Sequence, residues 1–572
     1  MDFLLQGADP EPLLPLQGGQ KNRTSHSSSE MYIQEDMTYP SKDGVDGLQI
    51  EGINDKVSVN SNDVPDRVYY VDWMRVCQIY MVVCYHVVQA LDEYVGLFEG
   101  DGRIDPTLED QPIGVNPTGS RVLVENFQTY CLMVGMPMFF YVSGRAQALG
   151  KQSKHFSAVV ASRTMRLFVP FLAAYAMLIP IWMYMHWPLA PEEAQKSLWN
   201  FELWYWSPKG FSFQPAWLWF LPALFFVDVG AAPLLRFSET KGTFEAFLSV
   251  VMITLNTAYF RNSGLSWAYC IWSHVGACFP ILMTFVIPFP DKQGQEVDGK
   301  LMTWTLSLLK WQCFQKSEQL FKETKNEWQQ VFQWVAVRLS TAVQILATIA
   351  MVSSFEYDSV KSMGAPACNL FFLFYMHGYF FERWQGSKDL FPIVPSTVIH
   401  GPEEWQKHRT LECFKKFVRV YQIVVTFSVG MIAIASAPAG RRERMLYPAF
   451  SASFEFEPGV RNIGFAVCHI LGTWAWIAIW PGLFQAYLDH LVQPGMYKHA
   501  SASTTVVYIF HWMFLKWFCV FVLDKYALKG SFFWKLVDIP ALFCFAIGGS
   551  LMIYWALLRS PKWLPIGKLF GL

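Results

Sequence analysis

The sequence predicts an all-α integral membrane protein, a bundle of about 10–12 transmembrane helices. Hydrophobic residues make up 53% of its 572 positions and charged residues only 16%, whereas a soluble protein carries about a quarter charged residues. The apolar residues gather in runs long enough to cross ~30 Å of hydrocarbon as helices. The 24 tryptophans and 24 tyrosines suit a chain with many helix ends at the membrane–water interface.

The chain is expected to divide near residue 66. Residues 1–66 are rich in Gly, Ser, Asn, Asp and Pro, which predicts a disordered cytosolic tail. The first residues have neither a basic segment nor a sustained apolar one, so we expect no secretory signal peptide. Residues 67–572 are predicted to form the multi-pass membrane domain.

Composition also indicates which binding partners and sites to expect. The net charge is −1 and no long basic stretch occurs, so nucleic acid is not an expected partner, whereas the lipid bilayer is. Eleven cysteines include no CxxC pair, and several lie inside apolar runs, so we expect neither a disulfide framework nor a metal site.

Twelve apolar segments are candidate spans. They lie near 70–91, 123–144, 166–187, 213–235, 245–260, 268–290, 331–353, 366–383, 415–436, 462–488, 504–524 and 536–558. The 245–260 segment is short for a span. Segment 301–313 is apolar but shorter still, and is expected to lie along an interface.

Loop charges predict the orientation. Loop 92–122 carries seven acidic and two basic residues, whereas loop 145–166 carries five basic residues and no acidic one. Because cytosolic loops are enriched in Lys and Arg, the second loop and the N-terminus are predicted to be cytosolic. Loop 437–461 holds four arginines where the alternation expects the opposite side.

The first predicted span carries three ionisable residues, Asp72, Arg75 and His86. Arg75 and His86 are eleven residues apart, so a helix places them within about 20° of one face and ~16 Å apart along the axis. Asp72 precedes Arg75 by three residues and can pair with it. An anchoring arginine and a packing histidine are the alternatives, but two such groups on one face favour a functional site.

Two later motifs suggest contacts to a ligand. The second span contains Pro137 and ends at Ser143-Gly144, which breaks helical regularity. Arg163 and Arg166 then open the third span, and two guanidinium groups one turn apart suit phosphate oxygens. A kinked, tightly packed helix and simple topology-determining arginines are the alternatives.

Aromatic and histidine residues complete the candidate set. Trp217-Leu-Trp219-Phe-Leu opens the fourth span, and Thr504, Tyr508 and His511 share one face of a late helix. The histidines at 274, 377 and 469 also lie in apolar runs, where a packing role is the simpler interpretation.

Taken in order, these motifs resemble the acyltransferase-3 family. They are Asp-x-x-Arg-x10-His, Phe-Phe-x-x-Ser-Gly, Arg-x-x-Arg-x-x-x-Pro, Trp-Phe-Leu and Thr-x-x-x-Tyr-x-x-His, and they extend from Asp72 to His511. One position departs from the family pattern, because Trp217 stands where the family often has histidine. Thr504 replaces the usual serine and keeps the hydroxyl.

The resemblance implies a ten-helix core and an enzyme, an O-acyltransferase. It would move an acyl group, often acetyl, from cytosolic acyl-CoA to a hydroxyl of a carbohydrate, lipid or small molecule. The catalytic residues would be His86, Arg75 and Asp72. Donor binding would involve Arg163, Arg166, Ser143 and Gly144, and substrate binding Trp219, Tyr508 and His511. No metal is expected.

The expected mechanism uses His86 as general base, since imidazole can exchange protons near neutral pH. The arginines would hold CoA phosphates at the cytosolic side, while an acceptor could approach His86 from the other side of the membrane. A proton-coupled secondary transporter using the same buried His, Arg and Asp residues is the alternative, and an inactive scaffold a third. Endomembrane, vacuolar and plasma membrane locations all remain open.

Overall fold

The computed structural model describes part of the chain. The described residues are 69–95, 119–149, 156–186, 194, 196–207, 216–262, 266–286, 289–290, 296–297, 318–353, 365–385, 424, 467, 470–481, 484, 494–519, 521, 532–560 and 566–570. All of them belong to the unit Arg67–Leu572. The predicted tail, segment 301–313, loop 437–461 and, apart from residue 424, segment 415–436 lie outside the described residues.

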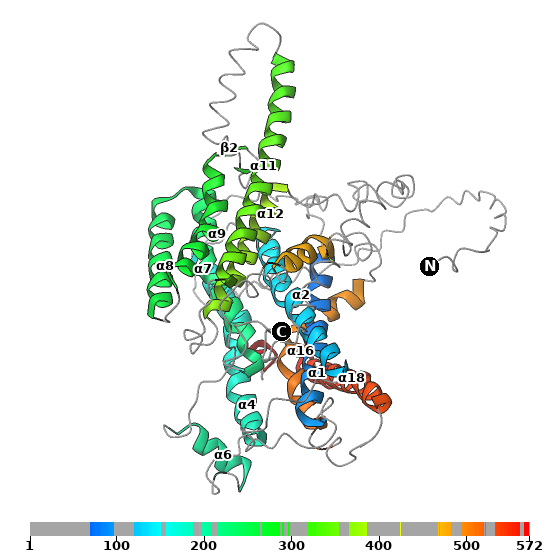
Figure 1. The fold of residues 1–572 in the computed structure, drawn as a ribbon. Coiled ribbons are helices and arrows are strands. Elements are labelled where there is room, and N and C mark those ends of the chain that lie inside the picture. Colours follow the sequence, from blue (N-terminus) through cyan, green and yellow to red (C-terminus); the bar gives the residue numbers. More distant parts are fainter. Residues whose placement is uncertain are drawn as a thin grey trace, which may run out of the picture. The chain divides into compact units, whose positions relative to one another are not determined.

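Helices dominate this unit (Figure 1). The N-terminal half contains α1 (Tyr69–Val95), α2 (Gly119–Leu149), α3 (Phe156–Arg163), the π-helical turn η2 (Thr164–Phe168), α4 (Val169–His186), α6 (Leu198–Tyr205), the 3-10 turn η3 (Ala216–Trp219), α7 (Phe220–Thr240), α8 (Thr243–Asn262) and α9 (Trp267–Val286). A short strand pair, β1 (Phe289–Pro290) and β2 (Glu296–Val297), follows. The rest contains α11 (Glu318–Ser353), α12 (Ala365–Gln385), the helix Ile470–Pro481, α16 (Pro494–Phe518), α18 (Phe532–Leu558) and α19 (Ile566–Leu569).

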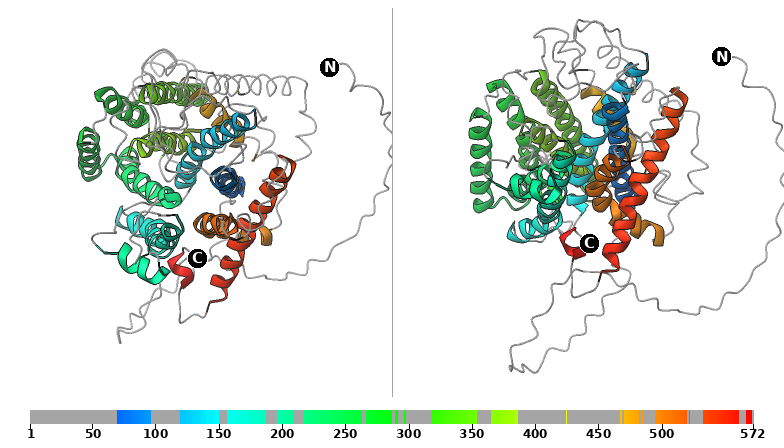
Figure 2. Two further views of the ribbon diagram at one scale, coloured as in Figure 1. Left: turned by 60° about the horizontal axis from the view of Figure 1, so that its bottom comes forward. Right: turned by 90° about the horizontal axis from the view of Figure 1, so that it is seen from below.

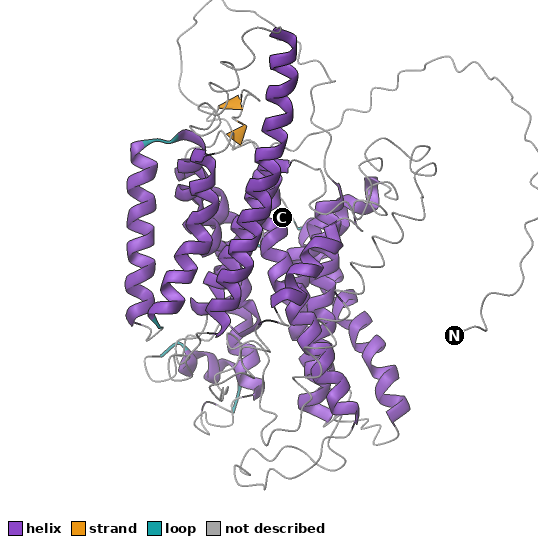
Figure 3. Cartoon of the chain, turned by 45° about the horizontal axis from the view of Figure 1, so that its top comes forward, coloured by secondary structure: helices purple, strands orange, loops and turns teal. Residues whose placement is uncertain are grey.

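The predicted all-α membrane fold is confirmed (Figure 3). Among the described residues, five helices are long and apolar enough to cross a membrane. They are Phe156–Tyr184, Ala216–Thr240, Trp267–Phe285, Val335–Ser353 and Asp538–Leu558. Thr243–Tyr259 and Ile470–Pro481 are shorter apolar helices, which agrees with the short 245–260 segment predicted from sequence. The total number of crossings remains a prediction.

Seen along the helix axes, α1 lies among α2, α16 and α18 (Figure 2). Helix α2 packs against α1 and also along α12, and α12 in turn contacts α7, α9 and α11. Helix α8 is peripheral and packs on α7 and α9. The first predicted span is therefore an interior helix, surrounded by protein on several faces.

Helices α2 and α12 cross in close contact, where two glycines face the opposite backbone. A Cβ atom on Gly144 would overlap the carbonyl oxygen of Tyr375, and one on Gly378 would overlap the carbonyl oxygen of Tyr141. The two contacts are reciprocal, so neither position accommodates a side chain. Small residues allow this close approach in membrane helices, where packing rather than water exclusion drives association.

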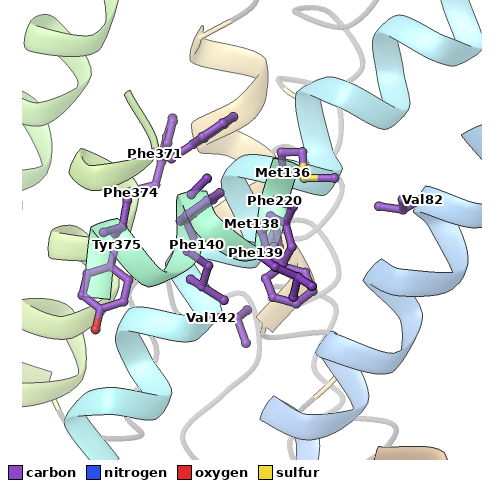
Figure 4. Close-up of a cluster of buried hydrophobic side chains, with 14 of the residues drawn as sticks. Val82, Met136, Met138, Phe139, Phe140, Val142, Phe220, Phe371, Phe374 and Tyr375 are labelled. Atoms are coloured by element: carbon purple, nitrogen blue, oxygen red, sulfur yellow. The ribbon is translucent and has the colours of Figure 1, made fainter. Parts of the chain in front are cut away.

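Aromatic rings fill the space beside the crossing (Figure 4). Phe140 of α2 stacks on Phe371 of α12, with ring centroids 4.6 Å apart and planes within 1°. Phe139 meets the edge of Phe220 of α7 at 4.4 Å. Three helices thus share one aromatic cluster, which fixes the start of α7 against the crossing.

Next to the glycines, a buried ion pair joins the same two helices. Arg145 Nε donates to Glu382 Oε2 at 2.7 Å, and its Nη2 donates to the hydroxyl of Tyr70 on α1 at 2.6 Å. Both charged side chains are at most 5% exposed. Since an unpaired charge at such a position is costly, the pair and its tyrosine fix the register of three helices.

We expect Gly144→Ala and Gly378→Ala to destabilise the protein by roughly 1–3 kcal/mol each, because the added methyl group overlaps backbone atoms that cannot rotate away. Thermal unfolding of the full chain in detergent micelles measures this effect. Gly548→Ala is the matched control, since a Cβ there meets no atom within 4 Å. Equal unfolding midpoints for the three variants would contradict the crossing.

Candidate active site

Two histidines from distant parts of the chain meet at the centre of the candidate site. His86 Nδ1 of α1 lies 2.7 Å from His511 Nε2 of α16, and the two ring planes differ by only 5°. The distance is that of a hydrogen bond between coplanar imidazoles. The site therefore depends on the packing of α1 against α16.

The hydrogen bonds of the other His511 nitrogen, Nδ1, show which ring nitrogens of the two histidines carry hydrogen. Nδ1 of His511 lies 2.7 Å from the Tyr508 carbonyl oxygen and 3.0 Å from that of Val507. A carbonyl only accepts, so this nitrogen carries hydrogen. With both rings neutral, as burial in a membrane helix favours, His511 Nε2 accepts from His86 Nδ1–H. The proton-accepting lone pair of His86 is then on Nε2, and no hydrogen bond joins that atom to another described residue.

Aromatic and cationic groups surround this pair. The Trp512 ring lies edge-on to His86 at 4.6 Å, and Tyr85 lies 5.2 Å away. Lys516, one turn further along α16, is buried with its Nζ 5.0 Å from the centroid of Trp512. It lies within electrostatic range of His86. The pair is thus flanked by aromatic rings and by the amine of Lys516.

Trp217 holds η3 against α16. Its indole Nε1 donates to the Ile509 carbonyl at 2.9 Å, and the Tyr508 hydroxyl donates to the Trp217 carbonyl. These two bonds orient the helix that carries His511. The Tyr508 hydroxyl predicted to bind substrate is therefore engaged with backbone. Trp219 stacks near Phe371 with ring centroids 6.1 Å apart, and only part of it is buried.

A second group gathers arginines from three elements. Arg75 lies 3.4 Å from Asp72, the pairing that their spacing predicts. Arg163 Nε lies 3.0 Å from Asp228 Oδ2 of α7. Arg166 is exposed and within electrostatic range of both Arg75 and Arg163.

Arg166 lies in the wide turn η2 because of the proline that follows. Pro170 has no backbone N–H, so it cannot donate to the carbonyl four residues earlier, which is that of Arg166. Val169 N–H bonds instead to the Thr164 carbonyl, five residues back, which gives a π turn. Such turns change the direction in which side chains project and occur at functional sites.

The structure separates the predicted residues into distinct groups. His86 and His511 come together, whereas Arg75, Arg163 and Arg166 form the other group, ~16 Å from His86 along α1. Ser143 is buried, and Gly144 forms the α2–α12 crossing. Tyr375, whose carbonyl faces Gly144, brings its ring to Asp228, which connects that crossing to the arginines.

Four residues at these groups or at the Arg145 ion pair are not part of the sequence motifs. They are Asp228, Glu382, Trp512 and Lys516. For the three charged ones the signal in the sequence is an ionisable residue inside an apolar run. Within the described part of the chain, no three His, Cys, Asp or Glu side chains lie together as a metal site would require.

Comparison with known proteins decides the family. A family model described as an acyltransferase domain matches residues 68–559, nearly the whole chain. The chain belongs to the acyltransferase-3 family. No curated protein and no solved structure matches it.

The hydrogen-bond pattern predicts that both His86 and His511 carry hydrogen on Nδ1 and none on Nε2. Solid-state NMR of protein with ¹⁵N-labelled histidine in lipid vesicles distinguishes the two tautomers. Each signal is assigned by its loss in His86→Phe or His511→Phe. A protonated Nε2 on His86 would contradict the assignment.

Proposed function

We propose that the protein transfers an acyl group, acetyl in the first instance, from cytosolic acyl-CoA to a hydroxyl of a carbohydrate, lipid or small molecule. The observation that carries this proposal is the His86–His511 hydrogen bond, which leaves His86 Nε2 as the proton acceptor. Family membership supports acyl transfer in a membrane. His86 of this pair would supply the base that such a reaction needs.

In the proposed reaction, the acceptor hydroxyl gives its proton to His86 Nε2 while its oxygen attacks the thioester carbonyl. The tetrahedral intermediate then collapses, the carbon–sulfur bond breaks, and the thiolate takes the proton back from His86. The His511 lone pair stabilises the transient imidazolium through the 2.7 Å hydrogen bond. The buried charge of Lys516 favours the oxyanion of the intermediate.

The arginine group is proposed to bind the phosphates of CoA. Arg163 is held by Asp228 and by Gln147, whose Oε1 accepts from Nη2 at 2.5 Å, so its position is fixed in advance. Arg166 is exposed and able to turn toward a ligand. Guanidinium groups bind phosphate in a forked geometry. The pantetheine arm would then extend along α1 from Arg75 to His86.

The depth of His86 supports transfer across the bilayer. Arg75 is proposed to lie at the cytosolic end of α1, because the more basic neighbouring loop is cytosolic. His86 is ~16 Å deeper, near the middle of ~30 Å of hydrocarbon. A donor from the cytosol and an acceptor from the opposite side could both reach it.

His86→Ala is expected to lower acyl transfer by about 10²–10⁴-fold, because general-base catalysis is lost. Purified protein is incubated with radiolabelled acetyl-CoA and membrane glycans or lipids, and labelled product and released CoA are counted. His274→Phe, which removes a histidine bonded to Thr257 and Cys270, is the matched control and should retain activity. Absence of CoA release and product from the wild type, across acceptors and chain lengths, would refute the proposal.

Arg166→Gln is expected to raise KM for acetyl-CoA about tenfold with little change in kcat, because one charged hydrogen bond to phosphate is lost. Acetyl-dephospho-CoA, which lacks one phosphate, identifies the contact. If Arg166 binds that phosphate, the variant no longer distinguishes the two donors. Arg236→Gln, which removes an arginine paired with Glu245, is the control. An unchanged KM in Arg166→Gln would exclude it from donor binding.

A further inference from the structure

A half-open cavity of about 60 Å³ lies on a face of α1 different from the one that carries His86. Its walls come from α1, α2 and the segment that includes Ile470–Pro481. Most of the lining is apolar and consists of Met74, Met81, Val134, Met138, Trp480 and Phe484. Gln78 and Cys77 complete it, and the exposure of Cys77 marks the open side.

Two polar side chains in this lining make no hydrogen bond to the described residues through their buried polar atoms. Gln78 is 5% exposed, and in the part of the chain that the structure describes neither its amide nitrogen nor its amide oxygen has a hydrogen-bond partner. The indole Nε1 of Trp480 is likewise buried without a partner. A buried polar group without a partner costs about 1–3 kcal/mol, so two at one cavity point to a bound molecule that pairs with them.

The size and lining restrict that molecule. A cavity of 60 Å³ is smaller than the ~150 Å³ cavity that accommodates benzene, so it admits a narrow chain and no ring system. Its apolar walls disfavour a charged group. The Gln78 amide and the Trp480 indole offer N–H donors, which a neutral carbonyl oxygen satisfies.

The depth of Gln78 in the membrane indicates which molecule would provide such a chain. Gln78 is three residues from Arg75, so it lies ~4.5 Å inside the polar end of α1. Ester groups of bilayer lipids occupy this level, at the boundary between headgroups and hydrocarbon. We propose that the cavity binds the fatty-acyl ester segment of a membrane lipid, with the ester carbonyl accepting from Gln78 and Trp480. This site is separate from the transfer centre and does not depend on the reaction.

Photolabelling tests the site in the full chain. The protein, in maltoside micelles, is irradiated with a lysophosphatidylcholine that carries a diazirine on its acyl chain, and adducts are mapped by mass spectrometry. We expect adducts at Met81, Met138 or Cys77. Unlabelled ester lipid should compete about tenfold better than the ether analogue of the same headgroup, since only the ester has the carbonyl.

Variants verify the recognising groups. Gln78→Leu or Trp480→Phe should remove most of the preference for ester over ether, and Val134→Phe should prevent labelling by filling the cavity. Gln344→Leu replaces a buried glutamine that does not line the cavity and should keep the preference. Equal competition by ester and ether in the wild type would overturn the proposal, as would adducts spread evenly over the helices. The wild-type comparison remains decisive even if a variant fails to fold.

Discussion

The structure depends on the contact between the backbones of α2 and α12 at Gly144 and Gly378. At this point the helices approach so closely that each glycine faces a carbonyl oxygen of its partner. The Arg145–Glu382 pair and the Phe140–Phe371 stack are possible only because the helices are this close. Since lipid provides no hydrophobic drive between helices, such close packing and the buried ion pair are what select this arrangement.

That crossing also places the charged residues that are candidates for donor binding. Tyr375 packs its carbonyl on Gly144 and reaches Asp228, which in turn holds Arg163. A substitution at the crossing therefore affects the arginine group as well as stability. An arginine or aspartate within a membrane helix is costly alone. Here Arg145 is paired with Glu382, and Arg163 with Asp228, in each case from another helix.

Helix α1 contributes to both side-chain groups and to the cavity. Arg75 joins the charged group at one end, and His86 meets His511 three turns further along the same face. The Gln78 amide, which has no hydrogen-bond partner among the described residues, lies ~80° from His86 around the helix, beside the 60 Å³ cavity. Different elements complete these places: α16 contributes His511, α3 contributes Arg163 with its partner Asp228 on α7, and α2 lines the cavity.

The sequence by itself determined the all-α membrane fold, the acyltransferase-3 family and the geometry within α1, including the Asp72–Arg75 pair. These follow from hydropathy, ordered motifs and helical periodicity, which are local properties. Only the tertiary structure decided that His511 is the partner of His86, 425 residues away, and that Trp217 orients the helix that carries it. The tertiary structure also showed why residue 144 is glycine: at the crossing with α12, where Gly378 lies, a Cβ atom at position 144 would overlap the Tyr375 carbonyl. Periodicity states which residues share a helix face, but which faces meet depends on how side chains of different helices pack together.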